Sequence, residues 1–156
     1  MSFTYYNPPK LIFMYGPPAA GKTTYSKNYC KENSGVIRIS ADEIRQVLYG
    51  SQDIYGNSER IFKALLQRMR SALLDGFDVI YDATNLRLDY RMDFLTALQN
   101  VPCSKEIRCI YVDEDTARQR HNVRGRNIPW DDLKPYFDIH EPPTLDEGWD
   151  VIRVVR

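Results

Sequence analysis

The sequence has few of the residues that bind metals or form disulfide bonds. It contains two histidines and three cysteines in 156 residues. Cys30, Cys103 and Cys109 cannot all pair within one chain, and no two of them have CxxC spacing. Neither His121 nor His140 has a second ligand at metal-site spacing, and we expect His121 to lie at the surface. We therefore predict no zinc site, no covalent enzyme intermediate, and a cytoplasmic location in which the thiols stay reduced.

Long apolar segments and an excess of one charge are also missing. No apolar stretch approaches the roughly 20 residues of a membrane span, and residues 1–9 lack the pattern of a signal peptide. Lys+Arg and Asp+Glu both number 21, so the net charge is zero. No global positive field can then recruit nucleic acid or a membrane, and any anion site has to be a local cluster. The composition, 43% hydrophobic and 27% charged, is typical of one soluble globular domain.

Apolar runs alternate with amphipathic segments along the chain. Residues 10–15 read KLIFMY, which is typical of a strand buried on both faces. Further strands are predicted at 36–39, 78–82, 107–112 and 151–155. Helices are predicted at 22–31, after Ser40, at roughly 58–75, at 89–100 and from Asp113 to about 124, with a short helix or lid element at 129–140. This order predicts an α/β fold with a parallel sheet of about five strands.

One motif dominates the N-terminal part of the chain. Residues 16–23 read GPPAAGKT and fit the phosphate-binding pattern G-x-x-x-x-G-K-[ST] between a predicted strand and helix. Its glycines permit backbone angles that aim successive N–H groups at one anion, and the helix N-terminus adds partial positive charge. We expect Lys22 to act on the β- and γ-phosphates and the Thr23 hydroxyl to bind Mg²⁺. The motif predicts ATP and Mg²⁺ as cofactors, with ATP bound by Gly16, Pro17, Pro18, Ala19, Ala20, Gly21, Lys22, Thr23 and Thr24.

Two charged residues follow the second predicted strand. Ser40 and Glu43 have the spacing of a capping box, and Asp42 lies between them. Ligands of open α/β sheets bind at the carboxyl ends of the strands, where a carboxylate can accept the proton of an attacking hydroxyl. Arg45 lies on the same helix face as Asp42. The pair predicts a catalytic base beside a cation for an acceptor phosphate; the alternative is a helix-cap acid and a solvated arginine.

A second acidic residue ends the third predicted strand. Asp82 closes the run DVIYD, the usual position of the second carboxylate of a P-loop metal site. We expect Asp82 and Thr23 to hold Mg²⁺ or its waters. The residues that follow carry hydroxyl, amide and guanidinium groups, and we predict that Thr84, Asn85 and Arg87 position the substrate. For Thr84 and Asn85 the alternative is turn chemistry before the next helix.

Four arginines lie within nine residues after the fourth predicted strand, namely Arg118, Arg120, Arg124 and Arg126. Gly125 and Pro129 interrupt the helix there, which indicates a hinged lid. We predict that Arg120 and Arg124 bind ATP and that Arg124 stabilises transition-state charge, a role worth about 10³–10⁵ in rate. Arg118 is expected to be a solvated surface residue.

Five segments of the chain, taken in order, form a recognisable set: GPPAAGKT, ISADEIR, DATNLRLDYR, RHNVRGRNIP and the tail HEPPTLDEGWDVIRVV. Together they resemble the kinase domain of the 5′-hydroxyl polynucleotide kinases of phage and bacterial RNA repair and animal DNA repair, and the resemblance spans roughly residues 10–155. It implies one P-loop kinase domain over residues 1–156, with a three-layer α/β/α fold and an arginine-bearing lid. It also implies that Asp42 is the general base on the 5′-hydroxyl and that Arg45 contacts the phosphate on the 3′ side of the acceptor nucleotide. Arg124, assisted by Arg120, would reach the ATP phosphates.

Two features depart from that family. In the phage enzyme an Asp directly precedes the Thr-Asn pair, whereas Ala83 holds that place here and Asp82 comes one residue earlier. The repair enzymes often carry a phosphatase domain with an Asp-x-Asp-Gly-Thr signature. This sequence has no such motif, so 3′-phosphatase activity would need another protein.

The leading interpretation is therefore a polynucleotide 5′-kinase, with a DNA or RNA 5′-hydroxyl end as partner. The alternative is a kinase of the same fold acting on a nucleoside, a sugar or another metabolite. The zero net charge favours this alternative slightly, since phosphate-backbone binders usually show a basic stripe. Tyr49, Tyr55 and Tyr90 are candidates for stacking on bases. A third possibility is an ATP-driven switch that transfers no phosphate, but a switch needs no acceptor-binding cation such as Arg45. The oligomeric state stays open.

Overall fold

The centre of the domain is a parallel sheet. The computed structural model describes residues 7–52 and 56–155, and within them five strands pair in the order β2-β3-β1-β4-β5. Every pairing in this sheet is parallel. The strands are β1 (Lys10–Tyr15), β2 (Val36–Ser40), β3 (Asp78–Asp82), β4 (Ser104–Cys109) and β5 (Val151–Val154). The predicted α/β class and five-stranded parallel sheet are confirmed.

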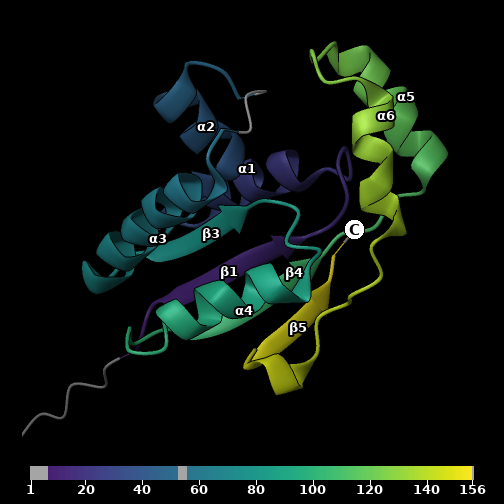
Figure 1. Ribbon diagram of the computed structural model, residues 1–156. Helices are drawn as coiled ribbons and strands as arrows, with labels where there is room; N and C mark the ends of the chain where they lie inside the picture. The colour runs from purple at the N-terminus through teal and green to yellow at the C-terminus, as the bar shows by residue number, and fades with distance from the viewer. Residues whose placement is uncertain (1–6, 53–55, 156) are drawn as a thin grey trace, which may run out of the picture.

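Helices connect the strands and cover the sheet (Figure 1). They are α1 (Lys22–Glu32), α2 (Ala41–Tyr49), α3 (Ser58–Leu74), α4 (Leu88–Ala97), α5 (Glu114–Arg124) and α6 (Trp130–Leu133), with 3₁₀ turns η1 (Lys134–Asp138) and η2 (Leu145–Glu147). The short α6 and η1 occupy the predicted lid element, and they lie with α5 beyond the carboxyl end of the sheet (Figure 1). None of the helices in the described ranges has the length and apolar character needed to cross a bilayer.

The central strand β1 is buried on both faces, as its apolar run predicts. Phe13 belongs to the larger core cluster, with residues of α3 and α4, and its ring contacts Phe94 at 5.5 Å between centroids. Ile12 and Met14 belong to a second cluster with side chains of α1. Side chains of a strand alternate between faces, so the two clusters lie on opposite sides of the sheet. This arrangement gives the predicted three layers.

The fourth strand begins and ends three residues earlier than the sequence predicts. We expected residues 107–112, but β4 runs from Ser104 to Cys109 and pairs along the whole length of β1. Its first residues are polar, so a search for apolar runs passes over them. Within the described residues, no strand pairs with the apolar residues after Cys109, because β1 ends at Tyr15 and the chain then turns at Gly16. Directly after β4, the N–H of Ile110 donates to the Tyr15 carbonyl at 2.8 Å.

Candidate active site

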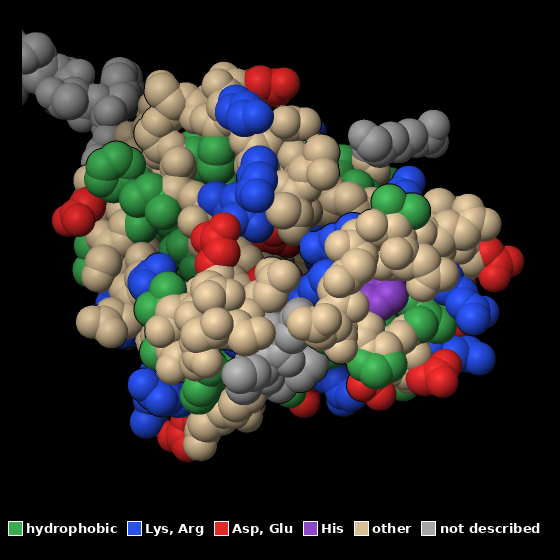
Figure 2. Space-filling model, turned by 90° about the horizontal axis from the view of Figure 1, so that it is seen from above, with side chains coloured by type: hydrophobic (Ala, Val, Ile, Leu, Met, Phe, Trp, Pro, Cys, Tyr) green, Lys and Arg blue, Asp and Glu red, His purple; other side chains and the backbone are tan. Residues whose placement is uncertain are grey.

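A cavity of about 1020 Å³ opens where the strands end. In the view from above, Lys and Arg side chains gather around the hollow at the middle of this face (Figure 2). Most residues predicted to bind ATP, metal or substrate line it. These are Pro18, Ala19, Ala20, Gly21, Lys22, Thr23, Thr24, Asp42, Arg45, Asp82, Thr84, Arg120 and Arg124. The predicted residues Gly16, Pro17, Asn85 and Arg87 are not among the lining residues.

The phosphate-binding loop is shaped by close backbone packing behind it. The N–H of Gly16 donates to the Thr84 carbonyl at 3.0 Å, and a Cβ on Gly16 would lie 2.4 Å from the carbonyl oxygen of Ile110. Ala19 and Gly21 have positive φ angles of 62° and 102°. Left-handed residues among right-handed ones turn successive N–H groups toward one point, which forms an anion-binding concavity. Gly16 therefore contributes by packing rather than by lining the cavity.

Lys22 begins α1 and lies inside the loop. Its side chain is buried, and its ammonium donates to the Pro17 carbonyl at 2.6 Å. Burial lowers the pKa of Lys22 to about 8, with Asp82 and Asp42 opposing the shift and Arg124 adding to it. A lysine in such a place gains strongly from a phosphate ligand, because the ligand compensates the buried charge.

Thr23 and Asp82, the two predicted metal ligands, are in contact. The Thr23 hydroxyl donates to Asp82 Oδ2 at 2.9 Å, and the Ser26 hydroxyl approaches the same oxygen at 3.4 Å. Because Thr23 gives its proton to the carboxylate, its oxygen lone pairs remain for a cation. Hydroxyl and carboxylate oxygens are the donors that Mg²⁺ prefers, and phosphate oxygens and waters usually complete its shell. These donors fit the magnesium site that a P-loop implies, and no cluster of three acidic, His or Cys ligands occurs among the described residues.

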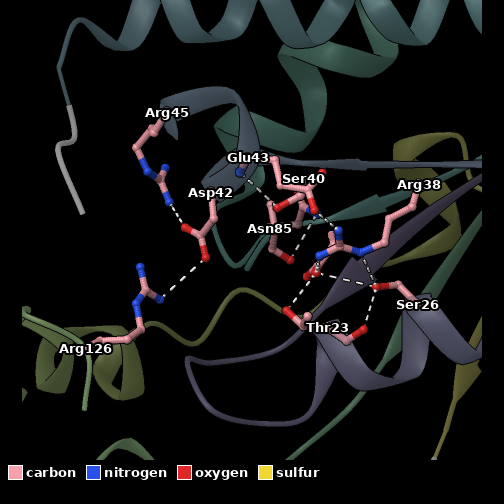
Figure 3. Close-up of polar contacts among 11 residues, drawn as sticks. Thr23, Ser26, Arg38, Ser40, Asp42, Glu43, Arg45, Asn85 and Arg126 are labelled. Atoms are coloured by element: carbon pink, nitrogen blue, oxygen red, sulfur yellow. Dashed lines mark hydrogen bonds and ion pairs between the residues drawn. The ribbon is translucent and has the colours of Figure 1, made fainter. Parts of the chain in front are cut away.

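Arg38 also contacts Asp82, which sequence reasoning missed. The guanidinium on β2 bonds to Asp82 Oδ2 at 2.5 Å and to Glu43 Oε1 at 2.5 Å, and its Nε donates to the Ser26 hydroxyl at 2.9 Å (Figure 3). The only signal in the sequence was a charged residue inside the apolar strand VIRIS. Glu43 therefore pairs with Arg38, while Ser40 accepts the Glu43 N–H at 3.3 Å as the predicted helix cap.

Asp42 lies in the first turn of α2 with a guanidinium on each side (Figure 3). Arg45 bonds to Asp42 Oδ1, and Arg45 Nε also donates to the carbonyl of Gln52 at 3.0 Å. Arg126 Nη1 lies 3.4 Å from Asp42 Oδ2. Asp42 is 30% exposed, so an acceptor in the cavity can reach it. The structure thus brings together the predicted base and its neighbouring cation, and adds a second cation from the lid.

The arginine-bearing lid reaches the phosphate-binding loop. Arg120 Nη1 donates to the Ala19 carbonyl at 3.0 Å, and Arg124 lines the cavity near Lys22. The expectation that His121 lies at the surface is wrong: His121 is buried, with Nε2 2.7 Å from the Ile128 carbonyl oxygen. It ties α5 to the segment that follows it, a contact that the spacing of the sequence does not show.

The remaining predicted substrate residues are not all in the cavity. Thr84 lines it, whereas the buried Asn85 has φ 48° and donates its side-chain amide to the Met14 carbonyl at 2.7 Å. This bond is part of the turn after β3, which is the alternative considered for Asn85. Arg87 is exposed at the start of α4.

The tyrosines at the cavity differ from those singled out as candidates for stacking. Tyr49 accepts the Asn57 N–H at 2.9 Å, and Tyr90 is exposed. Tyr55 lies outside the described residues. Two other aromatic residues, Tyr25 and Tyr136, line the cavity instead.

The family is decided by a match over most of the chain. Residues 11–135 match the family model AAA_33, described as an AAA domain. The chain belongs to this family. No curated protein sequence matches the chain.

Solved structures share the fold of this AAA domain. A chain of the Pnkp1/Rnl/Hen1 RNA repair complex superposes with a TM-score of 0.76 at 21% identity, over 86% of this chain and 44% of that one. A fungal RNA kinase superposes with a TM-score of 0.70 at 15% identity, over 96% of this chain and 39% of that one. A sugar kinase from Janibacter sp. HTCC2649 superposes with a TM-score of 0.69 at 20% identity, over 94% of this chain and 86% of that one. The chain thus spans less than half the length of the RNA repair chain. These likenesses establish a kinase-like P-loop fold.

The P-loop of this domain implies nucleotide binding, and α2 adds a carboxylate and a guanidinium to the same cavity. Lys22, Thr23 and Arg124 come from the loop and the lid, while Asp42 and Arg45 come from α2. A carboxylate beside a phosphate-binding loop can take a proton from a hydroxyl. The site can therefore support phosphoryl transfer.

Proposed function

We propose that this domain transfers the γ-phosphate of ATP to the 5′-hydroxyl of a polynucleotide. The observation that supports this most is the Asp42–Arg45 pair in the same cavity as Lys22 and Thr23. A domain that only binds or hydrolyses ATP needs no acceptor-side cation next to a carboxylate. The similarity of the segments around Asp42 and of the lid to polynucleotide kinases supports the choice of acceptor.

The donor side rests on the loop, α1 and the lid. ATP and Mg²⁺, when bound, supply the transferable phosphate and a divalent counter-charge to it. Thr23 and Asp82 would hold the metal through hydroxyl and carboxylate oxygens, directly or through water. Lys22 holds β- and γ-phosphate oxygens, and Arg124 stabilises the charge that develops during transfer.

The acceptor side rests on α2. Arg45 binds the phosphate 3′ of the terminal nucleotide and so places the 5′-hydroxyl near Asp42. Asp42 accepts the hydroxyl proton as the acceptor oxygen bonds to phosphorus and the bridging bond to ADP breaks. ADP leaves with the electron pair of that bond, and the product is a 5′-phosphorylated end. General-base contributions of this kind are worth about 10²–10⁴ in rate.

A kinase for a small hydroxyl compound is the second candidate. It is favoured by the zero net charge of the chain and by the likeness to a sugar kinase over nearly the whole of both chains. The same residues would act on the donor, and Asp42 would remain the base.

The decisive experiment measures transfer of ³²P from γ-labelled ATP to 5′-hydroxyl oligonucleotides of RNA and DNA, with Mg²⁺. We expect label on the oligonucleotide with the wild-type protein, and a loss of about 10²–10⁴-fold in Asp42→Ala with ATP binding retained. Absence of label with ATP bound would reject the polynucleotide acceptor, and a panel of nucleosides and sugars would follow. Full ATPase activity in Asp42→Asn, without label on any acceptor, would favour the switch.

A further inference from the structure

We propose that Arg126 is a specificity-determining residue that selects acceptors carrying a phosphate near the accepting hydroxyl. The inference rests on the proposed function and adds a lid residue to the acceptor site. Arg126 belongs to the arginine cluster of the lid, but the sequence pattern predicts no separate role for it.

Asp42 is held between two guanidinium groups from distant parts of the chain. Arg45, one turn further along α2, contacts Asp42 Oδ1. Arg126, in the segment after α5, has its Nη1 3.4 Å from Asp42 Oδ2. Figure 3 shows Asp42 in the middle of this line of three side chains. The two arginine side chains are only 14% and 13% exposed. Each oxygen of the predicted base therefore has a cation beside it.

The backbone that carries Arg126 is anchored to the lid helix. Gly125 ends α5 in the left-handed conformation, with φ 65°, and so reverses the chain. The His121 ring then contacts the Ile128 carbonyl oxygen at 2.7 Å and packs against the Trp130 ring at 5.7 Å between centroids. Arg126 lies inside the loop that these contacts close, and its side chain lines the cavity. Its reach toward α2 is thus a feature of the folded lid.

The acceptor hydroxyl has to share a carboxylate oxygen of Asp42 with the guanidinium beside it. To give its proton to Asp42, the hydroxyl has to come within hydrogen-bond distance of one of these oxygens. A phosphate placed between Arg45 and Arg126 offers each of them a bidentate, charge-assisted partner. Such a phosphate draws the guanidiniums toward itself and leaves a carboxylate oxygen to the hydroxyl. An acceptor without phosphate has to approach an oxygen that still has a guanidinium beside it.

The acceptor class that follows is a hydroxyl compound with a phosphomonoester or phosphodiester on the same small unit, such as a nucleoside 3′-phosphate. The lid that carries Arg126 also carries Arg120, which contacts the phosphate-binding loop. One segment therefore touches the donor loop and the acceptor base. An acceptor phosphate that engages Arg126 holds the same segment over the donor.

The test compares adenosine 3′-monophosphate with adenosine as acceptors. The kcat/KM ratio of the two is measured for the wild type, Arg126→Ala and Arg126→Lys. Arg118→Ala is the matched control, because it removes an exposed lid arginine, on the preceding helix α5, that does not line the cavity. The KM for ATP and the thermal midpoint are recorded for each variant.

We expect the wild type to prefer the 3′-phosphate, and Arg126→Ala to reduce that preference about tenfold or more, as for one lost charge-assisted hydrogen bond. Arg126→Lys should recover part of it, since it restores the charge without the planar fork. Arg118→Ala should keep the wild-type ratio.

Three results would overturn the inference. An unchanged kcat/KM ratio in Arg126→Ala would reject the inference while leaving the proposed phosphate transfer intact. A lower ratio with an equal rise in the KM for ATP and a lower thermal midpoint shows that the lid has lost its structure instead. Transfer to neither adenosine compound nor to any oligonucleotide by the wild type rejects the proposed function, and the inference with it.

Discussion

Arg38 on β2 forms a 2.5 Å ion pair with Asp82 at the end of β3, and both side chains are largely buried. The two strands are neighbours in the sheet, with Ser40 paired to Asp82 in register. Arg38 thus fixes the carboxylate that also accepts the Thr23 hydroxyl. The proposed metal site of Thr23 and Asp82 therefore depends on a cation that lies outside the phosphate-binding loop.

Replacing Arg38 by Met should destabilise the domain by about 3 kcal/mol, because it removes the ion-pair partner of the buried Asp82 carboxylate. Chemical denaturation measures the change in the free energy of unfolding. Arg153→Met is the matched control: Arg153 forms an ion pair of the same length with Glu106 but is 58% exposed, so its loss should cost at most about 1 kcal/mol. Equal losses in the two variants would show that Arg38 does not hold Asp82 in this way.

Lys22 should make the stability of the nucleotide-free protein depend on pH. Burial lowers the pKa of Lys22 in the folded state to about 8, from an ordinary value of 10.5. Between these values the unfolded chain binds more protons than the folded one, so the free energy of unfolding rises with pH from about 8 to about 10.5. Below about pH 8 the folded state bears the full cost of the buried charge, about 3 kcal/mol.

The measurement compares wild type with Lys22→Met by denaturation at several pH values. We expect Lys22→Met to be the more stable protein at pH 7 and the two to converge as the pH approaches about 10.5. The comparison cancels the titration of the other groups. A difference between the two proteins that stays constant across this range contradicts a buried, charged Lys22.

Gly16 should tolerate no side chain, although it does not line the cavity. A Cβ would lie 2.4 Å from the Ile110 carbonyl oxygen, so Gly16→Ala forces β1 and β4 apart where they end. We expect a loss of about 1–3 kcal/mol and weaker ATP binding. In Gly35→Ala the new Cβ meets nothing within 4 Å, but the φ of 75° is strained. That control should lose stability and keep ATP binding, as measured by titration with a fluorescent ATP analogue.

Local patterns in the sequence predict the sheet and much of the site. The phosphate-binding loop is a contiguous motif, and Asp42 with Arg45 follows from a strand end and helix spacing, so neither needs knowledge of distant contacts. Arg38 is different, because its partners lie on α1, α2 and β3 and meet only when the sheet forms. His121 is buried by a loop and an aromatic ring that follow it in the chain. Neither contact leaves a periodic signal in the sequence.

Arg45 and Arg120 should separate the acceptor side of the cavity from the donor side. Arg45 lies beside Asp42 on α2, whereas Arg120 contacts the phosphate-binding loop through the Ala19 carbonyl. Arg45→Ala should therefore raise the KM for the acceptor about tenfold or more and leave the KM for ATP within about twofold. Arg120→Ala should raise the KM for ATP more than the KM for the acceptor. Steady-state kinetics with each substrate varied in turn measures both values. If Arg45→Ala raised the KM for ATP as much as the KM for the acceptor, its guanidinium would belong to the donor site. The lid and α2 would then bind the same ligand, ATP.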